Sequence, residues 1–172
     1  NESFVKEKAY VSSFLDVLKE KTGRGLSEDG IHASLVTFSS RPFLNMILTG
    51  SEAGFKSELS TAPFLPGLSF PSAALKYVKD TVFSPSEYDR PDFLNIVIFL
   101  SDGTVGDPST MGMSVAAMRS AGAQMSAVCV DGARPCDKAT MAKYFTTFDD
   151  ISTPETVANY LSVILNSFQT CK

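Results

Sequence analysis

The chain has 172 residues, of which 44% are hydrophobic and 20% are charged, so it is long and apolar enough to form the core of one domain. Its 15 basic and 19 acidic residues give a net charge of −4, which argues against a dedicated nucleic-acid binder with a basic stripe. The longest apolar stretch, residues 94–100, has the length of a strand and not the roughly 20 residues of a membrane span.

Helical and strand-like patterns alternate along the chain. The first twenty residues carry apolar side chains at helical spacing, namely Phe4, Val11, Leu15 and Leu18. Two strand-like segments follow, joined by a short connection typical of a hairpin. The expected strands are 31–38, 43–48, 94–100, 124–130 and 147–151, and the later helices are 51–59, 74–82, 111–118, 138–145 and 157–168.

The segment LNIVIFL, residues 94–100, is almost continuously apolar and rich in β-branched residues. This pattern is typical of a strand that is covered on both faces in a parallel sheet. Together with the alternating order of elements, it predicts the α/β class. We expect an open, doubly wound, mostly parallel sheet with helices on both faces and one antiparallel edge strand.

Two loops are candidate sites, because ligands of such sheets bind outside the carboxyl ends of the strands. The sequence SDGT follows the apolar strand directly, so Asp102 would face the crevice, although Asp-Gly is also a common turn dipeptide. The second loop, residues 67–72, enters a helix. A hydroxyl of Ser69 or Ser72 could cap that helix or point toward Asp102. Carboxylate, hydroxyl and water oxygens together suit a hard cation such as Mg²⁺.

The usual catalytic signatures are absent from the sequence. It contains no GxGxxG, GxxxxGK[ST], CxxC, HExxH or GxSxG motif. The single histidine, His32, lies inside a predicted strand, where a structural role is favoured over that of a base. The sequence therefore predicts a protein that is not an enzyme. The remaining enzymatic alternative is a doubly wound hydrolase or phosphatase that uses Asp102 as nucleophile or metal ligand.

The cysteine count is odd. Cys129 and Cys136 flank a short turn, and Cys171 is the penultimate residue. Either the three are unrelated thiols, or one local bridge forms and the terminal cysteine pairs outside this chain.

Five segments in succession resemble the von Willebrand factor type A domain family, also called the integrin inserted domain. They are FVKEKAYVSSFLDVLKE, IHASLVTFSS, PGLSFPSAALKYVKD, LNIVIFLSDGTVGDP and AGAQMSAVCVDG, and the resemblance covers essentially all 172 residues. It implies a divalent cation at a metal-ion-dependent adhesion site, whose shell is completed by an acidic residue of the ligand. On this resemblance Asp102 is a metal ligand, and Ser69 stands where the family has a threonine.

The family's first strand and the Asp-x-Ser-x-Ser loop after it have no counterpart in the sequence. A sheet without this central strand would leave buried backbone groups unpaired, at about 1–3 kcal/mol each, against a total stability of about 5–15 kcal/mol. We therefore expect residues 1–172 to be a single von Willebrand factor A-like domain, truncated at its N-terminal strand. That strand would come from a segment missing from the sequence or from another polypeptide, and so would the partner of Cys171.

The resemblance implies a secreted or cell-surface adhesion or matrix-binding module, one domain of a larger protein. Asp102 and Ser69 would hold Mg²⁺ or Mn²⁺, unless the lost first loop abolishes the site. Phe70, Thr104 and Asp107 would form the ligand-facing rim, with plain loop structure as their alternative role. The expected partner is an extracellular protein with an acidic residue, such as collagen or another matrix component. The alternative is a metal-independent structural or assembly module.

Overall fold

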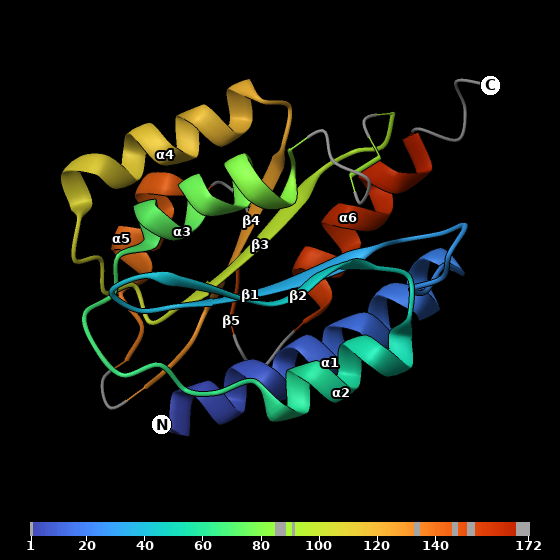
Figure 1. The fold of residues 1–172 in the computed structure, drawn as a ribbon, viewed down its shortest axis with the longest axis horizontal. Coiled ribbons are helices and arrows are strands. Elements are labelled where there is room, and N and C mark those ends of the chain that lie inside the picture. Colours follow the sequence, from blue (N-terminus) through green and yellow to red (C-terminus); the bar gives the residue numbers. More distant parts are fainter. Residues whose placement is uncertain are drawn as a thin grey trace.

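Helices and strands alternate along the chain in the predicted order (Figure 1). The structure, a computed structural model, describes residues 2–84, 89–90, 92–132, 135–145, 148–150 and 154–167. The strands are β1 (Ala33–Phe38), β2 (Pro42–Thr49), β3 (Ile96–Ser101), β4 (Gln124–Cys129) and β5 (Phe148–Asp150). The helices are α1 (Glu2–Thr22), α2 (Glu52–Thr61), α3 (Pro71–Tyr77), the π-helix η1 (Val78–Val82), α4 (Pro108–Ser120), α5 (Lys138–Tyr144) and α6 (Glu155–Ser167).

The strands form two sheets in the described part of the chain. β1 and β2 make an antiparallel hairpin, and β3, β4 and β5 make a parallel sheet in that order. The predicted α/β class, with parallel inner strands and an antiparallel edge strand, is confirmed. The boundary between the two sheets lies between β1 and β3.

Helices cover both faces of the parallel sheet. In Figure 1, α3 and α4 lie on one side of β3 and β4, and α1 and α2 lie on the opposite side. Alternate side chains of β4 enter two separate cores. Met125, Ala127 and Cys129 pack with α3, α4 and α5, whereas Val128 packs with α1 and α6. A third, smaller core of Leu26, Phe55 and Leu59 joins α2 to the β1–β2 hairpin.

Helix α1 forms because its apolar residues recur at helical spacing, but its most buried stripe differs from the predicted one. Tyr10, Phe14 and Leu18 are buried, while Val11 and Leu15 are half-buried between two cores. The helix ends at Thr22 and is followed by Gly23, which adopts a left-handed φ of 66°.

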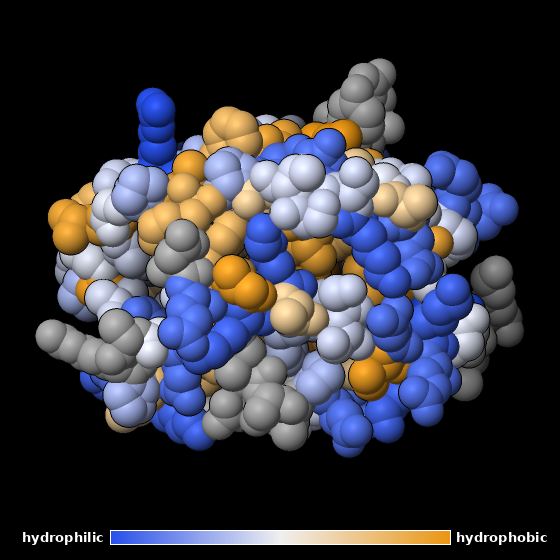
Figure 2. All heavy atoms as spheres, turned by 90° about the horizontal axis from the view of Figure 1, so that it is seen from below, coloured by the Kyte–Doolittle hydropathy of each residue, from blue (hydrophilic) through white to orange (hydrophobic). Residues whose placement is uncertain are grey.

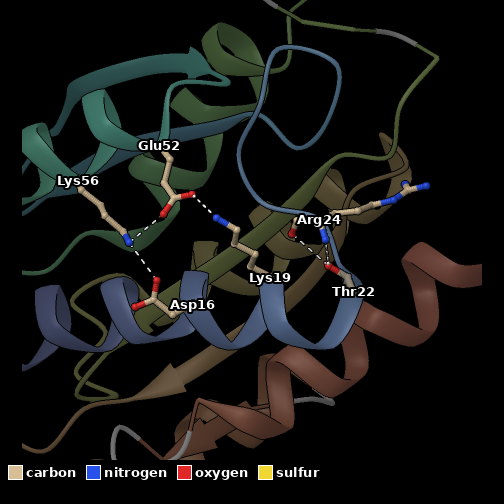
Figure 3. A network of polar contacts seen from close by, with 6 residues as sticks. All are labelled: Asp16, Lys19, Thr22, Arg24, Glu52 and Lys56. Carbon is tan, nitrogen blue, oxygen red and sulfur yellow. Dashed lines mark hydrogen bonds and ion pairs between the residues drawn. The ribbon is translucent and has the colours of Figure 1, made fainter.

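Ion pairs join the solvent-facing sides of α1 and α2 (Figure 3). Lys56 Nζ lies 3.0 Å from Asp16 Oδ1 and 2.9 Å from Glu52 Oε1, and Lys19 Nζ lies 3.4 Å from Glu52 Oε2. Such solvent-accessible pairs contribute little to the stability of the fold, about 0–1 kcal/mol each. The two helices are therefore held mainly by their buried faces.

The outer surface of these helices is polar. Figure 2 views the molecule from the side on which α1 and α2 lie in Figure 1, and hydrophilic residues cover most of that face, with separate hydrophobic patches between them. Among the residues that the structure describes, no helix has both the length and the hydropathy to cross a membrane.

Candidate functional site

Three loops meet at the carboxyl ends of β1 and β3. The backbone N–H of Phe70 donates to the carbonyl of Ser39 at 3.0 Å, and the N–H of Gly106 donates to the carbonyl of Ser69 at 2.8 Å. The loop before α3 is thus fixed to the loops that follow β1 and β3. This arrangement brings Ser69 and Phe70 beside the loop that contains Asp102.

Asp102 is exposed at this edge and sits on a rigid turn. Its Oδ1 accepts a hydrogen bond from the N–H of Thr104 at 2.8 Å, and its carbonyl accepts one from the N–H of Asp137 at 2.9 Å. Gly103 has a φ of 83°, and a Cβ there would lie 2.7 Å from the carbonyl oxygen of Asp137. The turn therefore requires glycine, and it holds the Asp102 carboxylate in an exposed position.

Glu7 of α1 interacts electrostatically with Asp102. Its side chain is half-buried, and burial together with the negative charge of Asp102 raises its pKa to about 7. Glu7 was not predicted as a site residue from the sequence. The signal was its position three residues after Phe4 and four before Val11, on the apolar side of the predicted helix. Its interaction with Asp102 links this position of α1 to the site.

The loop before α3 does not cap its helix in the expected way. Phe70 occupies the N-cap position and makes no side-chain cap hydrogen bond, while Ser69 lies one residue earlier and is half-buried. Ser72 lies within the helix and hydrogen-bonds to Asp107. The expectation that Ser69 or Ser72 caps this helix is therefore wrong. The helix starts at Pro71, so the N-cap position falls on Phe70, between the two serines.

Asp107 links α3 to α4. Its Oδ2 accepts hydrogen bonds from both the N–H and the hydroxyl of Ser72, with the N–H at 3.2 Å. Its carbonyl accepts from the N–H groups of Thr110 and Met111 at the start of α4. Its Oδ1 is buried and has no hydrogen-bond partner among the described residues. Thr104, in contrast, is exposed. A ligand-binding role for Thr104, Asp107 and Phe70 stays a prediction.

Of the two alternatives for the cysteines, the structure contains the local bridge. Cys129 and Cys136 are bonded, with their Cα atoms 5.7 Å apart, and Cys171 lies outside the described residues. The bridge ties the end of β4 to the residue before Asp137. Since Asp137 donates to the backbone of Asp102, the disulfide helps to fix the Asp102 turn.

The donors at this edge suit a weakly held hard cation. The residues for which the structure gives a placement contain no group of three or more His, Cys, Asp and Glu side chains able to bind a metal. Two carboxylates, of Asp102 and Glu7, and the hydroxyl of Ser69 on the adjoining loop are oxygen donors of the kind Mg²⁺ takes. This set fits a cation that keeps several waters, and not one held by protein atoms alone.

The sequence model of the von Willebrand factor type A domain matches residues 1–162. The chain therefore belongs to the von Willebrand factor type A domain family, as its segments predicted. No curated protein sequence matches the chain.

Solved structures share the fold at low sequence identity. The chain aligns with proximal thread matrix protein 1 from the mussel byssus at a TM-score of 0.67 and 16% identity, covering 94% of this chain and 40% of that one. It aligns with the conserved hypothetical protein BatB from Bacteroides thetaiotaomicron at a TM-score of 0.69 and 13% identity, covering 97% of this chain and 88% of that one.

A third similar structure is the manganese-loaded TRAP protein of Plasmodium vivax, with a TM-score of 0.62 and 15% identity, covering 81% of this chain and 59% of that one. Another structure of the mussel protein has a zinc-occupied MIDAS motif. The chain spans about two fifths of the mussel protein's length. At these identities the likeness shows a common fold.

Proposed function

We propose that this domain is a non-catalytic binding module of an extracellular adhesion or matrix protein, and that it recognises a protein ligand through a divalent cation. The observation that carries the proposal is the exposed carboxylate of Asp102, held on a rigid turn where three loops meet. Asp102 and Ser69 would hold Mg²⁺ or Mn²⁺, directly or through water, with Glu7 beside them. A cation with open coordination positions can accept an acidic residue from a partner.

Two further observations support this proposal. Similar folds include one structure with a zinc-occupied MIDAS motif and one loaded with manganese. The Cys129–Cys136 disulfide suits an oxidising, extracellular location. The proposed partner is an extracellular protein with an exposed acidic residue, collagen or another matrix component, and the domain would be part of a larger protein.

The proposed rim of the site has two kinds of residue. Thr104 and Phe70 would contact the ligand, since Thr104 is exposed and Phe70 lies on the adjoining loop. Asp107 would act by holding that rim in place, because its carboxylate is bonded to Ser72.

Thermal melting in Mg²⁺, Mn²⁺ and EDTA tests the cation site. A cation at 100 times its dissociation constant stabilises a protein by about 2.7 kcal/mol, which raises the Tm of a domain of this size by about 5–10 °C. We expect this shift in the wild type and its loss in Asp102→Ala. The matched control is Asp92→Ala, because Asp92 is also an exposed aspartate but lies before β3, at the opposite end of that strand.

Partner binding separates the proposal from its alternatives. Binding to immobilised collagen or another matrix protein should be lost in EDTA and in Asp102→Ala, and kept in Asp92→Ala. Binding that survives both treatments would favour the metal-independent assembly module. Hydrolysis of a generic phosphate ester that disappears in Asp102→Ala would favour the hydrolase.

A further inference from the structure

The connection between α2 and α3 is apolar and exposed at the same time. It has the sequence APFLPGLSF, residues 62–70, and we call it the apolar loop. Five of its nine residues are exposed, and they include Leu68, at 66% exposure, and Phe64, at 46%. Single exposed apolar side chains are ordinary, whereas two large ones on one short segment indicate an interaction surface.

The first half of the apolar loop is anchored on α1. The ring centroid of Phe64 lies 5.9 Å from that of Phe4. Lys8 Nζ lies 5.3 Å from the centroid of the Phe4 ring and donates to the carbonyl of Ser60 at 2.9 Å. Figure 1 shows this connection passing the N-terminal end of α1. Phe64 is therefore held in place by packing although its side chain reaches solvent.

The second half of the apolar loop is anchored at the candidate cation site. Gly67 has a φ of 136°, and a Cβ there would lie 2.9 Å from Ser40 Oγ, so this position requires glycine. The carbonyl of Ser69 accepts the hydrogen bond from Gly106. Leu68 lies between these two anchors and directly precedes Ser69. A side chain held in this way loses little conformational entropy when a partner covers it.

The charges around the apolar loop suit an acidic partner. The sequence has no acidic residue from position 59 to position 79. Lys8 lies at one end of the loop, and the exposed Arg41 follows Ser40, which lies beside Gly67 at the other end. An acidic segment that crosses the loop therefore meets basic side chains at both ends and no carboxylate of the loop itself.

The spacing of Leu68 and Ser69 sets the spacing of the ligand residues that would contact them. Consecutive Cα atoms are about 3.8 Å apart, so a group held at Ser69 and one packed on Leu68 lie roughly 5–8 Å from each other. In an extended peptide, residues i and i+2 point to the same side and lie about 7 Å apart, whereas i and i+1 point to opposite sides. The i, i+2 spacing therefore fits.

We propose that the apolar loop is a specificity subsite for protein ligands in which an apolar residue stands two positions from the acidic residue. The acidic residue would bind the cation at Asp102 and Ser69, and the apolar side chain would pack on Leu68, with Phe64 extending the contact. Because Leu68 adjoins Ser69, the chain that brings the acidic residue also covers the loop. The inference rests on the proposed function, to which it adds the residues that flank the acidic group.

Binding of short peptides in Mn²⁺ tests this proposal. The probes are GSLSESG and GSESLSG, which carry the leucine two positions before or after the glutamate. Of the three controls, GSLESSG places the two residues side by side, GSSSESG lacks the leucine and GSLSQSG lacks the acid. Each peptide is displayed at high density on a biosensor surface, so that multivalency makes weak binding measurable.

We expect at least one probe to bind about tenfold or more tightly than all three controls. Leu68→Ser should remove this advantage and Phe64→Ser should reduce it, while both variants keep the melting shift in Mn²⁺. The matched control is Val163→Ser, because Val163 is 69% exposed but lies on α6. Equal loss in Leu68→Ser and Val163→Ser would contradict the proposal.

The melting shift separates failure of this inference from failure of the proposed function. A wild type that shifts in Mn²⁺ but binds both probes no better than GSSSESG would keep its cation site and overturn the apolar subsite. A wild type that does not shift in Mn²⁺ would overturn the proposed function and this inference together. Binding to phosphatidylserine vesicles that is lost in Leu68→Ser, without preference among the peptides, would show that the loop inserts into membranes and would also overturn the proposal.

Discussion

Glu7 is the acidic residue of the site whose ionisation is coupled most directly to folding. Its pKa of about 7 in the folded protein lies above its usual value near 4.5. Between these two values the folded state holds a proton that the unfolded state has released, so stability falls as pH rises. The stabilising contribution of protonated Glu7 is fully present below pH 4.5 and is lost by the time the pH has passed 7.

Replacing Glu7 by glutamine should remove this pH dependence. We expect Glu7→Gln to match the wild type near pH 4 and to be more stable than it at pH 8, by about 1–3 kcal/mol. Urea denaturation in EDTA at pH 4, 5.5 and 8 measures the difference. Glu20→Gln is the control, because Glu20 is an exposed glutamate on the same helix. A wild type and Glu7→Gln with parallel pH profiles would show that Glu7 is not perturbed.

Individual residues of the site differed in how far the sequence predicted them. Asp102 could be proposed because a carboxylate directly after a continuously apolar strand lies at the edge where ligands bind. Glu7 could not be assigned in the same way, because its proximity to Asp102 depends on how α1 packs across the sheet. The hydrogen bonding at the start of α3 was also not predicted. The N–H of Ser72 donates to the carboxylate of Asp107, which lies 35 residues away, and no local pattern shows that.

The helices α3 and α4 are joined by a polar contact that should be energetically coupled. Asp107 accepts two hydrogen bonds from Ser72, and Thr110 Oγ1 lies 3.1 Å from the Ser72 hydroxyl. In a double-mutant cycle, Asp107→Ala and Ser72→Ala should show a coupling free energy of about 0.5–3 kcal/mol, measured by urea denaturation. Pairing Asp107→Ala with Ser109→Ala should give additive effects, because Ser109 is an exposed residue in the first turn of α4. Additive effects in both cycles would mean that the contact is not formed in solution.

The order and type of the elements could be predicted because each depends on local patterns. The LNIVIFL run identified β3, and the helical spacing of Met111, Val115 and Met118 identified α4, in which all three are buried. The π-helical segment 78–82 was expected only as part of a helix, since its distinct hydrogen bonding has no sequence signal that distinguishes it. Element boundaries also differ from the prediction by a few residues. Residues 31–32 were expected at the start of the first strand, but they precede β1.

At the scale of the molecule, a cavity of about 520 Å³ lies between β1 and β3. Within the described residues β1 pairs only with β2, so the β1–β2 hairpin is joined to the parallel sheet mainly through helices and loops.

The hairpin should consequently open more easily than the parallel sheet. Among the residues that the structure describes, its core with α2 contains three buried side chains, Leu26, Phe55 and Leu59, whereas the core beneath α3, α4 and α5 contains twelve. We expect native-state hydrogen exchange at increasing urea to reveal a lower opening free energy in β1, β2 and α2 than in β3 and β4, by about 1–3 kcal/mol.

Two core substitutions sharpen this prediction. Leu59→Ala should lower the opening free energy of the hairpin and α2 and leave that of β3 and β4 almost unchanged. Met118→Ala, in the larger core, should lower both, because opening of the parallel sheet unfolds the whole molecule. If every amide reported one opening free energy in both variants, the hairpin and the parallel sheet would form a single cooperative unit, and the cavity between β1 and β3 would not weaken their connection.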